Sequence, residues 1–443
     1  MKANLVILQF TRNPAYFECN HRLSTHLIVY DVSKLKYLSR VRLCENSSND
    51  KNSQQEKSEM ENRFFKQATI FFKPSLFFKR VNSACIVFFL CLVFITPNTV
   101  DAAKSVVQKA DFSGKIIEWV IPFHLGGGST KWATFYAPLL AEELPGKPKI
   151  VIKNVPGASS TLGANQFASQ AKPDGLTILG TSGSTQFPYM LGDSRVKYDY
   201  KDWQVVLATP TGGVVYVHSD SRIKKASDLV KNPKPFLFGS LGVTSLDLIA
   251  LLGFELLGVN VDAIFGMRGR KAGWLAFQRG LTSIDFQTSS SYLAQVQPEV
   301  FSGKVVALMS WGALDKEGNI VRDPTFPDLP SFPEVYEEIH GKVPSGPAWD
   351  AWKAFFVAGF PVQKMVFLPK GTPDYIVKAY NQAFERVIAK EGFAAAAKKT
   401  LGLYPQMTGE DAKTALQQAI GVNERATKWV QNWLTEKYQI TFH

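Results

Sequence analysis

The feature that most constrains the fold is an alternation of short apolar segments with amphipathic ones, joined by loops of small residues. The apolar segments are six or seven residues long, as is typical of buried strands. The predicted strands cover residues 116–122, 149–155 and 176–181, and the predicted helices cover residues 130–144 and 161–171. Strands and helices that alternate in this way form a parallel sheet with right-handed crossovers. The sequence therefore predicts an α/β fold.

A second run of the same kind starts near Gly213. Its predicted strands cover residues 214–218, 236–239, 261–265, 283–287, 305–310 and 353–358, and its predicted helices cover residues 244–257, 375–399 and 410–438. A chain of 443 residues is long enough for more than one domain. We expect two α/β lobes.

Residues 79–102 have the pattern of a cleaved export signal. Lys79 and Arg80 precede an apolar run over residues 84–95, and small side chains end the segment at Ala102. A membrane anchor is the alternative, but a membrane span needs about 20 apolar residues. We expect cleavage after about Ala102 and a periplasmic mature protein.

The 78 residues before this signal are unusual. Residues 46–61 are polar and have no hydrophobic period, which indicates a disordered segment. Met60 offers an internal start with a basic leader behind it. We interpret residues 1–78 as a non-native or disordered extension, in which residues 1–59 come from an over-extended reading frame.

The net charge and the positions of the cysteines exclude several classes of function. The net charge of +12 is shared evenly between residues 1–102 and the rest, so it gives no reason to expect nucleic acid as a partner. All four cysteines precede residue 103, which excludes a disulfide scaffold or a cysteine-ligated metal beyond it. Walker, dinucleotide and Gly-x-Ser-x-Gly motifs are missing, and the histidines are far apart. We expect no metal, no cofactor and no enzymatic activity.

Three loops of small residues follow predicted strands, at residues 126–130, 156–160 and 180–185. The carboxyl ends of parallel strands meet at one edge of a sheet, where ligands bind. Backbone N–H groups at a helix start bind anions, and Ser or Thr hydroxyls add donors. Alternatively, glycines form turns there and hydroxyls cap helices. We favour a small-anion site.

The second run of strands and helices contains further candidate ligand-binding residues. A glycine loop at residues 239–242 precedes a predicted helix, and Arg268 follows a strand together with Arg270 and Lys271. Arginine can bind a carboxylate through two hydrogen bonds, but these cations can equally form a solvated surface. Asp285 lies inside an apolar strand, so it needs either a ligand group or a structural arginine as partner. Trp349 and Trp352 could form a platform for a ligand, but we favour a role in core or hinge packing.

These motifs, in this order behind an export signal, resemble the periplasmic solute receptors of the tripartite tricarboxylate transporter family, also called the Bug family. The resemblance covers residues 110–440 and rests on several short segments. They are Val120-Ile121-Pro122-Phe123 with Gly126-Gly127-Gly128, Asn154-Val155-Pro156-Gly157-Ala158, Lys172-Pro173-Asp174-Gly175, Gly239-Ser240-Leu241-Gly242, residues 352–359 and Pro369-Lys370-Gly371-Thr372-Pro373.

The resemblance implies a two-lobed, type II periplasmic-binding-protein-like fold with two crossovers and a ligand cleft between the lobes. The first lobe would comprise residues 103–212 plus 313–443, and the second would comprise residues 213–312. In the family, the glycine loop and the Pro-Gly loop hold the ligand carboxylate, partly through water. Asp285 matches a position that can contact the distal end of the ligand.

The chain also departs from the family pattern. Ser129-Thr130 replaces the usual Thr-Asp, Ser159 and Ser160 replace two glycines, and Arg268-Gly269-Arg270 replaces Lys-Gly-Gly. A more hydroxylated and more cationic cleft suits a larger or doubly charged anion. The predicted ligand-binding residues are Phe123, Gly126, Gly127, Gly128, Ser129, Thr130, Pro156, Gly157, Ala158, Ser159, Ser160, Ser182, Ser240, Ser245, Arg268 and Asp285.

We therefore predict a monomeric, non-catalytic receptor that binds a small carboxylate and delivers it to a membrane permease. Two alternatives stay open. The protein could instead pass its ligand-bound state to a signalling kinase. It could also be an α/β hydrolytic enzyme that uses Ser182.

Overall fold

The computed structural model describes residues 108–442. The predictions for the export signal, its cleavage after Ala102 and the extension before it lie outside the described residues. No helix in the described part of the chain is long and apolar enough to cross a membrane.

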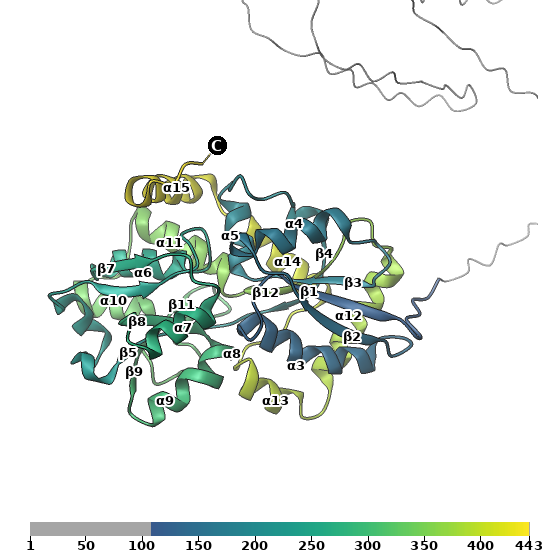
Figure 1. The fold of residues 1–443 in the computed structure, drawn as a ribbon, viewed down its shortest axis with the longest axis horizontal. Coiled ribbons are helices and arrows are strands. Elements are labelled where there is room, and N and C mark those ends of the chain that lie inside the picture. The colour runs from purple at the N-terminus through teal and green to yellow at the C-terminus, as the bar shows by residue number, and fades with distance from the viewer. Residues whose placement is uncertain (1–107, 443) are drawn as a thin grey trace, which may run out of the picture. The chain divides into compact units, whose positions relative to one another are not determined.

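The first half of the structure is built on a five-stranded sheet with the order β2-β1-β3-β12-β4 (Figure 1). Strands β1, β2 and β3 are parallel, as the sequence predicts, whereas β12 runs antiparallel to β3 and β4. The sheet is therefore mixed rather than wholly parallel. Its strands are β1 (Ile116–Ile121), β2 (Lys149–Asn154), β3 (Thr177–Gly180), β4 (Gln204–Thr209) and β12 (Lys364–Leu368).

Helices bury both faces of this sheet because apolar side chains alternate between its two sides. Trp119 on β1 packs with Trp132 and Tyr136 on one face, and Val120 packs with Phe167 on the other. The first face is covered by α3 (Gly128–Glu143), α12 (Asp374–Ala389) and α13 (Phe393–Thr400), and the second by α4 (Thr161–Gln170) and α14 (Gly409–Ile420). Helix α5 (Gly183–Met190) follows β3 and joins the core of the other half through Phe187.

The second half contains a five-stranded sheet with the order β7-β6-β8-β5-β9. Strands β6, β7 and β8 are parallel, and β5 runs antiparallel to both β8 and β9. Its strands are β5 (Gly213–His218), β6 (Phe236–Gly239), β7 (Val261–Ile264), β8 (Ile284–Thr288) and β9 (Val305–Ser310). A small ribbon, β10 (Ala313–Leu314) with β11 (Ile320–Val321), follows β9.

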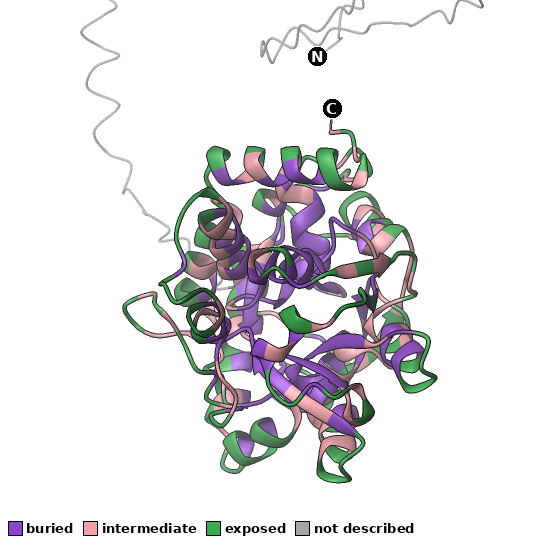
Figure 2. Ribbon diagram, turned by 90° about the vertical axis from the view of Figure 1, so that its left-hand side faces the viewer, coloured by how far each residue is buried: buried purple, intermediate pink, exposed green. Residues whose placement is uncertain are grey.

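Helices also enclose the second sheet, in which β5, β6 and β8 are largely buried whereas the edge strand β7 is not. Figure 2 shows buried segments in the interior of the structure and exposed ones at its rim. One face packs against α6 (Leu248–Leu257), α10 (Phe332–His340), α11 (Pro347–Gly359) and α15 (Glu424–Tyr438). The other face packs against α7 (Arg270–Gln278) and the segment that contains α8 (Ser289–Ser291) and α9 (Gln297–Phe301).

Three helices from residues 313–443, which the resemblance assigns to the first lobe, pack on the second sheet. They are α10, α11 and α15. Trp352 of α11 and Trp433 of α15 belong to one apolar core with Phe238 of β6. Helix α11 lies beside α15 in Figure 1, in the half that contains β5 to β9. The chain consequently passes between the halves three times: from β4 to β5, from α11 to β12, and from α14 to α15. The family resemblance implies two such crossings, and the return of α15 adds the third.

Residues 353–358, predicted as a strand, lie inside helix α11, so this prediction is wrong. Short apolar runs fit a buried helix as well as a buried strand. Pro347 starts the helix, and Trp352 and Phe356, one turn apart, stack with ring centroids 5.1 Å apart. Full burial of Trp352 confirms its predicted packing role.

The two long C-terminal helices predicted from the sequence are each divided. Gly392, in the left-handed conformation, separates α12 from α13. Residues 421–423 separate α14 from α15. The second break is what allows α15 to reach the second sheet.

A buried hydrogen-bond chain ties together the first crossing, which runs from β4 to β5. The Gly212 amide donates to the Ser289 hydroxyl (2.9 Å), and that hydroxyl bonds the Tyr404 hydroxyl (2.7 Å). Tyr404 in turn donates to the Asp323 carboxylate (2.7 Å). A Cβ atom on Gly212 would lie 1.8 Å from an Asp323 oxygen, so only glycine fits there.

Candidate functional site

The three predicted loops lie side by side because β2, β1 and β3 are adjacent and parallel. The glycine loop (residues 123–128) leads from β1 into α3, and the Pro-Gly loop (residues 156–160) follows β2. The loop after β3 begins α5, where the Ser182 hydroxyl accepts a hydrogen bond from the Ser184 amide. That bond makes Ser182 a helix cap, as in the structural alternative considered for these hydroxyls.

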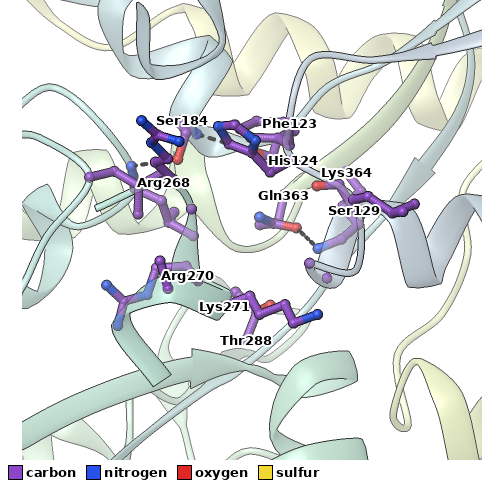
Figure 3. Close-up of a pocket in the computed structure, with 18 of the residues that line it drawn as sticks. Phe123, His124, Ser129, Ser184, Arg268, Arg270, Lys271, Thr288, Gln363 and Lys364 are labelled. Atoms are coloured by element: carbon purple, nitrogen blue, oxygen red, sulfur yellow. Dashed lines mark hydrogen bonds between the residues drawn. The ribbon is translucent and has the colours of Figure 1, made fainter. Parts of the chain in front are cut away.

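Loops of the second sheet face these loops across a cleft. The basic loop (residues 266–271) follows β7 and begins α7. A cavity of about 240 Å³ lies between the glycine loop and the basic loop (Figure 3). A second cavity of about 280 Å³ lies between the Pro-Gly loop and the basic loop. The two cavities adjoin because they share Phe123, His124, Leu241, Arg268 and Gly269.

Most of the predicted ligand-binding residues line this cleft. The first cavity is lined by Phe123, Gly127, Gly128, Ser129, Ser182 and Arg268. The second is lined by Phe123, Pro156, Gly157, Ala158, Ser159, Ser160 and Arg268. The predicted residues that line neither cavity are Gly126, Thr130, Ser240, Ser245 and Asp285.

Among these five residues, the three that carry hydroxyls form hydrogen bonds within the protein. Thr130 accepts a hydrogen bond from Asn154 (3.0 Å). Ser240 donates to Asp247 (3.0 Å), and Ser245 donates to the carbonyl of Gly242 (2.7 Å). Their geometry matches the capping and turn roles that the sequence left as the alternative.

Asp285 has the structural arginine that its burial requires. The side chain is fully buried, and its carboxylate pairs with Arg270 and accepts a hydrogen bond from Tyr216 (2.5 Å). Arg270 also contacts Asp247 (3.3 Å) and lies over the Phe286 ring, 4.5 Å from its centroid. Two buried carboxylates thus balance the charge of Arg270, and the Asp285 carboxylate does not reach the cavities.

The backbone of the Pro-Gly loop is strained. Ala158, Ser159 and Ser160 have φ values of 45°, 54° and 91°, a region that residues other than glycine rarely adopt. Such positions cost of order 1–3 kcal/mol each and cluster at ligand clamps. The two serines that stand in place of the family's glycines therefore keep a conformation suited to glycine.

Two cleft residues were missed from the sequence. Gln363 and Lys364 lie at the start of strand β12 and line the first cavity. The last strand predicted from the sequence lies at residues 353–358 instead, so no strand was expected at Lys364. An available signal was the apolar run after Lys364, which ends at the Pro369-Lys370-Gly371-Thr372-Pro373 turn.

Cations dominate the electrostatics of the first cavity. Among the residues that the structure describes, its lining includes Arg268, Arg270, Lys271 and Lys364 but neither aspartate nor glutamate. Burial lowers the pKa of Lys364 to about 7. Burial also lowers the pKa of Lys131 in the first turn of α3, and the nearby charge of Lys271 adds to that effect.

The described residues contain no group of three or more His, Cys, Asp or Glu side chains that could hold a metal ion. What the cleft presents is a helix start, hydroxyls and unbalanced positive charge. This arrangement can hold a small anion through backbone amides and cationic side chains.

The family model described as "Tripartite tricarboxylate transporter family receptor" matches residues 139–405. The chain belongs to this family. Its members are periplasmic solute-binding receptors rather than enzymes, so the predicted family and the predicted lack of catalysis are confirmed.

Among relatives of this receptor, a UPF0065 protein of Bordetella pertussis is 28% identical over 292 residues, which is 63% of this chain and 79% of the relative. The structure of periplasmic binding protein BugD superposes with a TM-score of 0.56 at 21% identity, covering 73% of this chain and 98% of BugD. The R. palustris protein Rpa4515, solved with adipate, gives a TM-score of 0.56 at 19% identity, with coverage of 72% and 98%. These likenesses confirm the two-lobed periplasmic-binding-protein fold.

Proposed function

We propose that this receptor binds a small organic carboxylate in the cleft between its two sheets and delivers it to a tripartite tricarboxylate-type permease. The observation that carries the proposal is the lining of the first cavity, where Arg268, Lys271 and Lys364 meet the start of α3 and none of the three forms an ion pair with an acid among residues 108–442. A carboxylate supplies the charge and the acceptor oxygens that this lining leaves unmatched. The adipate complex of a protein with the same fold supports the choice of ligand class.

Membership of the family supports the proposed delivery and location. We infer that the export signal directs the protein to the periplasm and is removed after about Ala102. The closed, ligand-bound form is what the permease recognises, because closure changes the relative position of the two halves. A monomer suffices for this task.

Calorimetric titration of the purified protein tests the proposal, after unfolding and refolding to strip any carried ligand. We expect at least one of adipate, succinate, malate and citrate to bind with a dissociation constant near the micromolar range, or about −8 kcal/mol. Uncharged analogues of the same length, such as 1,6-hexanediol, are expected not to bind, because they cannot balance the cationic lining.

A matched pair of arginine variants locates the binding. Arg268 lines both cavities, whereas Arg279 ends α7 on the exposed surface and lines neither. We expect Arg268→Gln to weaken binding at least tenfold and Arg279→Gln to leave it unchanged. Absence of carboxylate binding, or equal affinities in the two variants, contradicts the proposal.

A further inference from the structure

Lys364 is a buried cation in the wall of the first cavity. It is the first residue of β12, its relative exposure is 2%, and its ammonium donates to the side-chain oxygen of Gln363. Lys364 pairs with Thr209 across β12 and β4, and Trp132 of α3 donates to the Thr209 hydroxyl (3.1 Å). The Lys364 side chain therefore shares the face of the sheet that α3 covers.

No carboxylate balances this ammonium. Within residues 108–442, Lys364 forms no ion pair with any acid. The same holds for Arg268 and Lys271, whereas Arg270 is already paired with Asp247 and Asp285. The other titratable groups around the cavity and the first turn of α3 are His124 and Lys131, which add no negative charge.

Burial of an uncompensated charge is costly, and the cost is relieved when an opposite charge binds beside it. A lysine retained for strand packing alone would contribute more as an apolar side chain. Lys364 lies in the wall of a cavity and not in a closed core, so an anionic ligand can reach it.

The unbalanced cations stand on two sides of the cavity. Lys364 and Gln363 belong to the first sheet, and the bond between them lies across the cavity from Arg270 and Lys271 (Figure 3). Arg268 and Lys271 belong to the basic loop of the second half. A ligand with a single carboxylate can balance only one of these sides.

We propose that Lys364 is a specificity-determining residue that pairs with one carboxylate of the ligand while Arg268 and Lys271 hold another. The receptor then selects small molecules with two or more carboxylates over monocarboxylates. This inference rests on the proposed function, because it assumes that the cleft binds carboxylates. It adds the number of carboxylates on the ligand and names the residue that distinguishes dicarboxylates from monocarboxylates.

The test compares acids of equal length by calorimetry: adipate with hexanoate, and succinate with butyrate. The wild-type protein is expected to bind the preferred dicarboxylate at least tenfold more tightly than its monocarboxylate partner. In Lys364→Met, dicarboxylate affinity falls at least tenfold and the preference shrinks, because one anchoring charge is gone. The control, Lys370→Met, removes an exposed lysine that pairs with Asp202 just beyond β12, and it should bind like the wild type.

Two further readouts separate a ligand contact from a packing role. Titration in buffers of different ionisation enthalpy should show proton uptake on binding near pH 7 in the wild type, since burial lowers the pKa of Lys364 into that range, and less uptake in Lys364→Met. The ligand-free variant should also melt at a higher temperature than the wild type, because a buried charge has been removed.

The outcomes are distinguishable. A wild-type protein that binds no carboxylate overturns both this inference and the proposed function. Carboxylate binding without a preference for two charges, or with equal dicarboxylate affinity in Lys364→Met, overturns this inference alone. A variant that melts lower and binds mono- and dicarboxylates equally poorly shows a packing role and also overturns it.

Discussion

At the scale of single residues, Lys364 links the pH of the medium to the stability of the fold. The pKa of an unfolded lysine lies near 10.4, and burial lowers that of Lys364 to about 7 in the folded chain. Between these two values the unfolded chain binds a proton that the folded chain does not. The contribution of Lys364 to the free energy of unfolding must therefore rise as the pH increases from about 7 toward 10.

The expected consequence is a pH-dependent difference in the free energy of unfolding between the ligand-free wild type and Lys364→Met. The stability deficit of the wild type should shrink as the pH rises from 7 to 9, by up to about 1.4 kcal/mol per pH unit. Urea unfolding of both proteins at pH 6, 7, 8 and 9 measures it. Taking the difference removes the effects of all other titrating groups, and parallel pH profiles would refute the assignment.

Residue-level prediction from the sequence succeeded where the chemistry is local. The glycine and Pro-Gly loops could be placed at the cleft because each directly follows a recognisable strand. The sequence left open whether Asp285 pairs with a ligand group or with a structural arginine. Only the fold decides between them, since its partner Arg270 lies 15 residues away and belongs to a different element. For Lys364, the apolar run that follows it indicates a strand, but its place in the cleft wall depends on which residues surround it in space.

At the scale of elements, the first crossing is held by a chain of buried polar contacts. Asp323 is fully buried with Tyr404 as a hydrogen-bond donor, and burial raises the pKa of Asp323 to about 6. The pKa of the unfolded aspartate is near 3.9. Because the folded value is the higher one, the cost of burying Asp323 grows as the pH rises from about 4 to 6 and is complete above that range.

Tyr404→Phe is expected to destabilise the protein by about 1–3 kcal/mol at pH 7.5, since it removes one of the donors to a buried carboxylate, which then keeps the Thr325 amide (2.8 Å). The loss should be smaller at pH 5, where Asp323 is protonated. Urea unfolding at both pH values measures the change. Tyr375→Phe, at a partly exposed tyrosine of α12, serves as the control and should shift stability by less than about 0.5 kcal/mol. An equal loss at both pH values argues against a role for the Asp323 charge.

The predicted elements were mostly right where a pattern was bounded by glycine or proline. Strands β1, β2 and β3 and helices α3 and α4 fall within about two residues of their predicted ranges. The apolar run in α11 fits a strand equally well, because burial on all sides removes the periodicity that distinguishes helix from strand. The antiparallel direction of β12 and β5 depends on the path of the chain, which local sequence does not encode.

At the scale of the whole molecule, the two halves share too much structure to unfold separately. Three connections join them, and the core of the second half contains Phe187 of α5 together with Trp352 of α11 and Trp433 of α15. Loss of either sheet therefore exposes apolar side chains that the other half holds in place.

We expect one calorimetric transition for residues 103–443, with a calorimetric enthalpy close to the van't Hoff enthalpy. Added ligand should move this single transition to higher temperature without dividing it, because the cleft in which we propose that it binds is lined by both halves. Two resolved transitions, or a ligand that shifts only part of the heat absorption, would show that the halves unfold independently.

In a chain that is synthesised amino end first, the sheet order delays the completion of both halves. Strand β12 lies between β3 and β4, so the first sheet stays open in its middle until residue 368 has emerged. The core of the second half lacks α15 until residue 438 has emerged. We therefore expect neither half to complete its core before most of the chain has emerged, which suits the export of an unfolded chain that we infer from the sequence of residues 79–102.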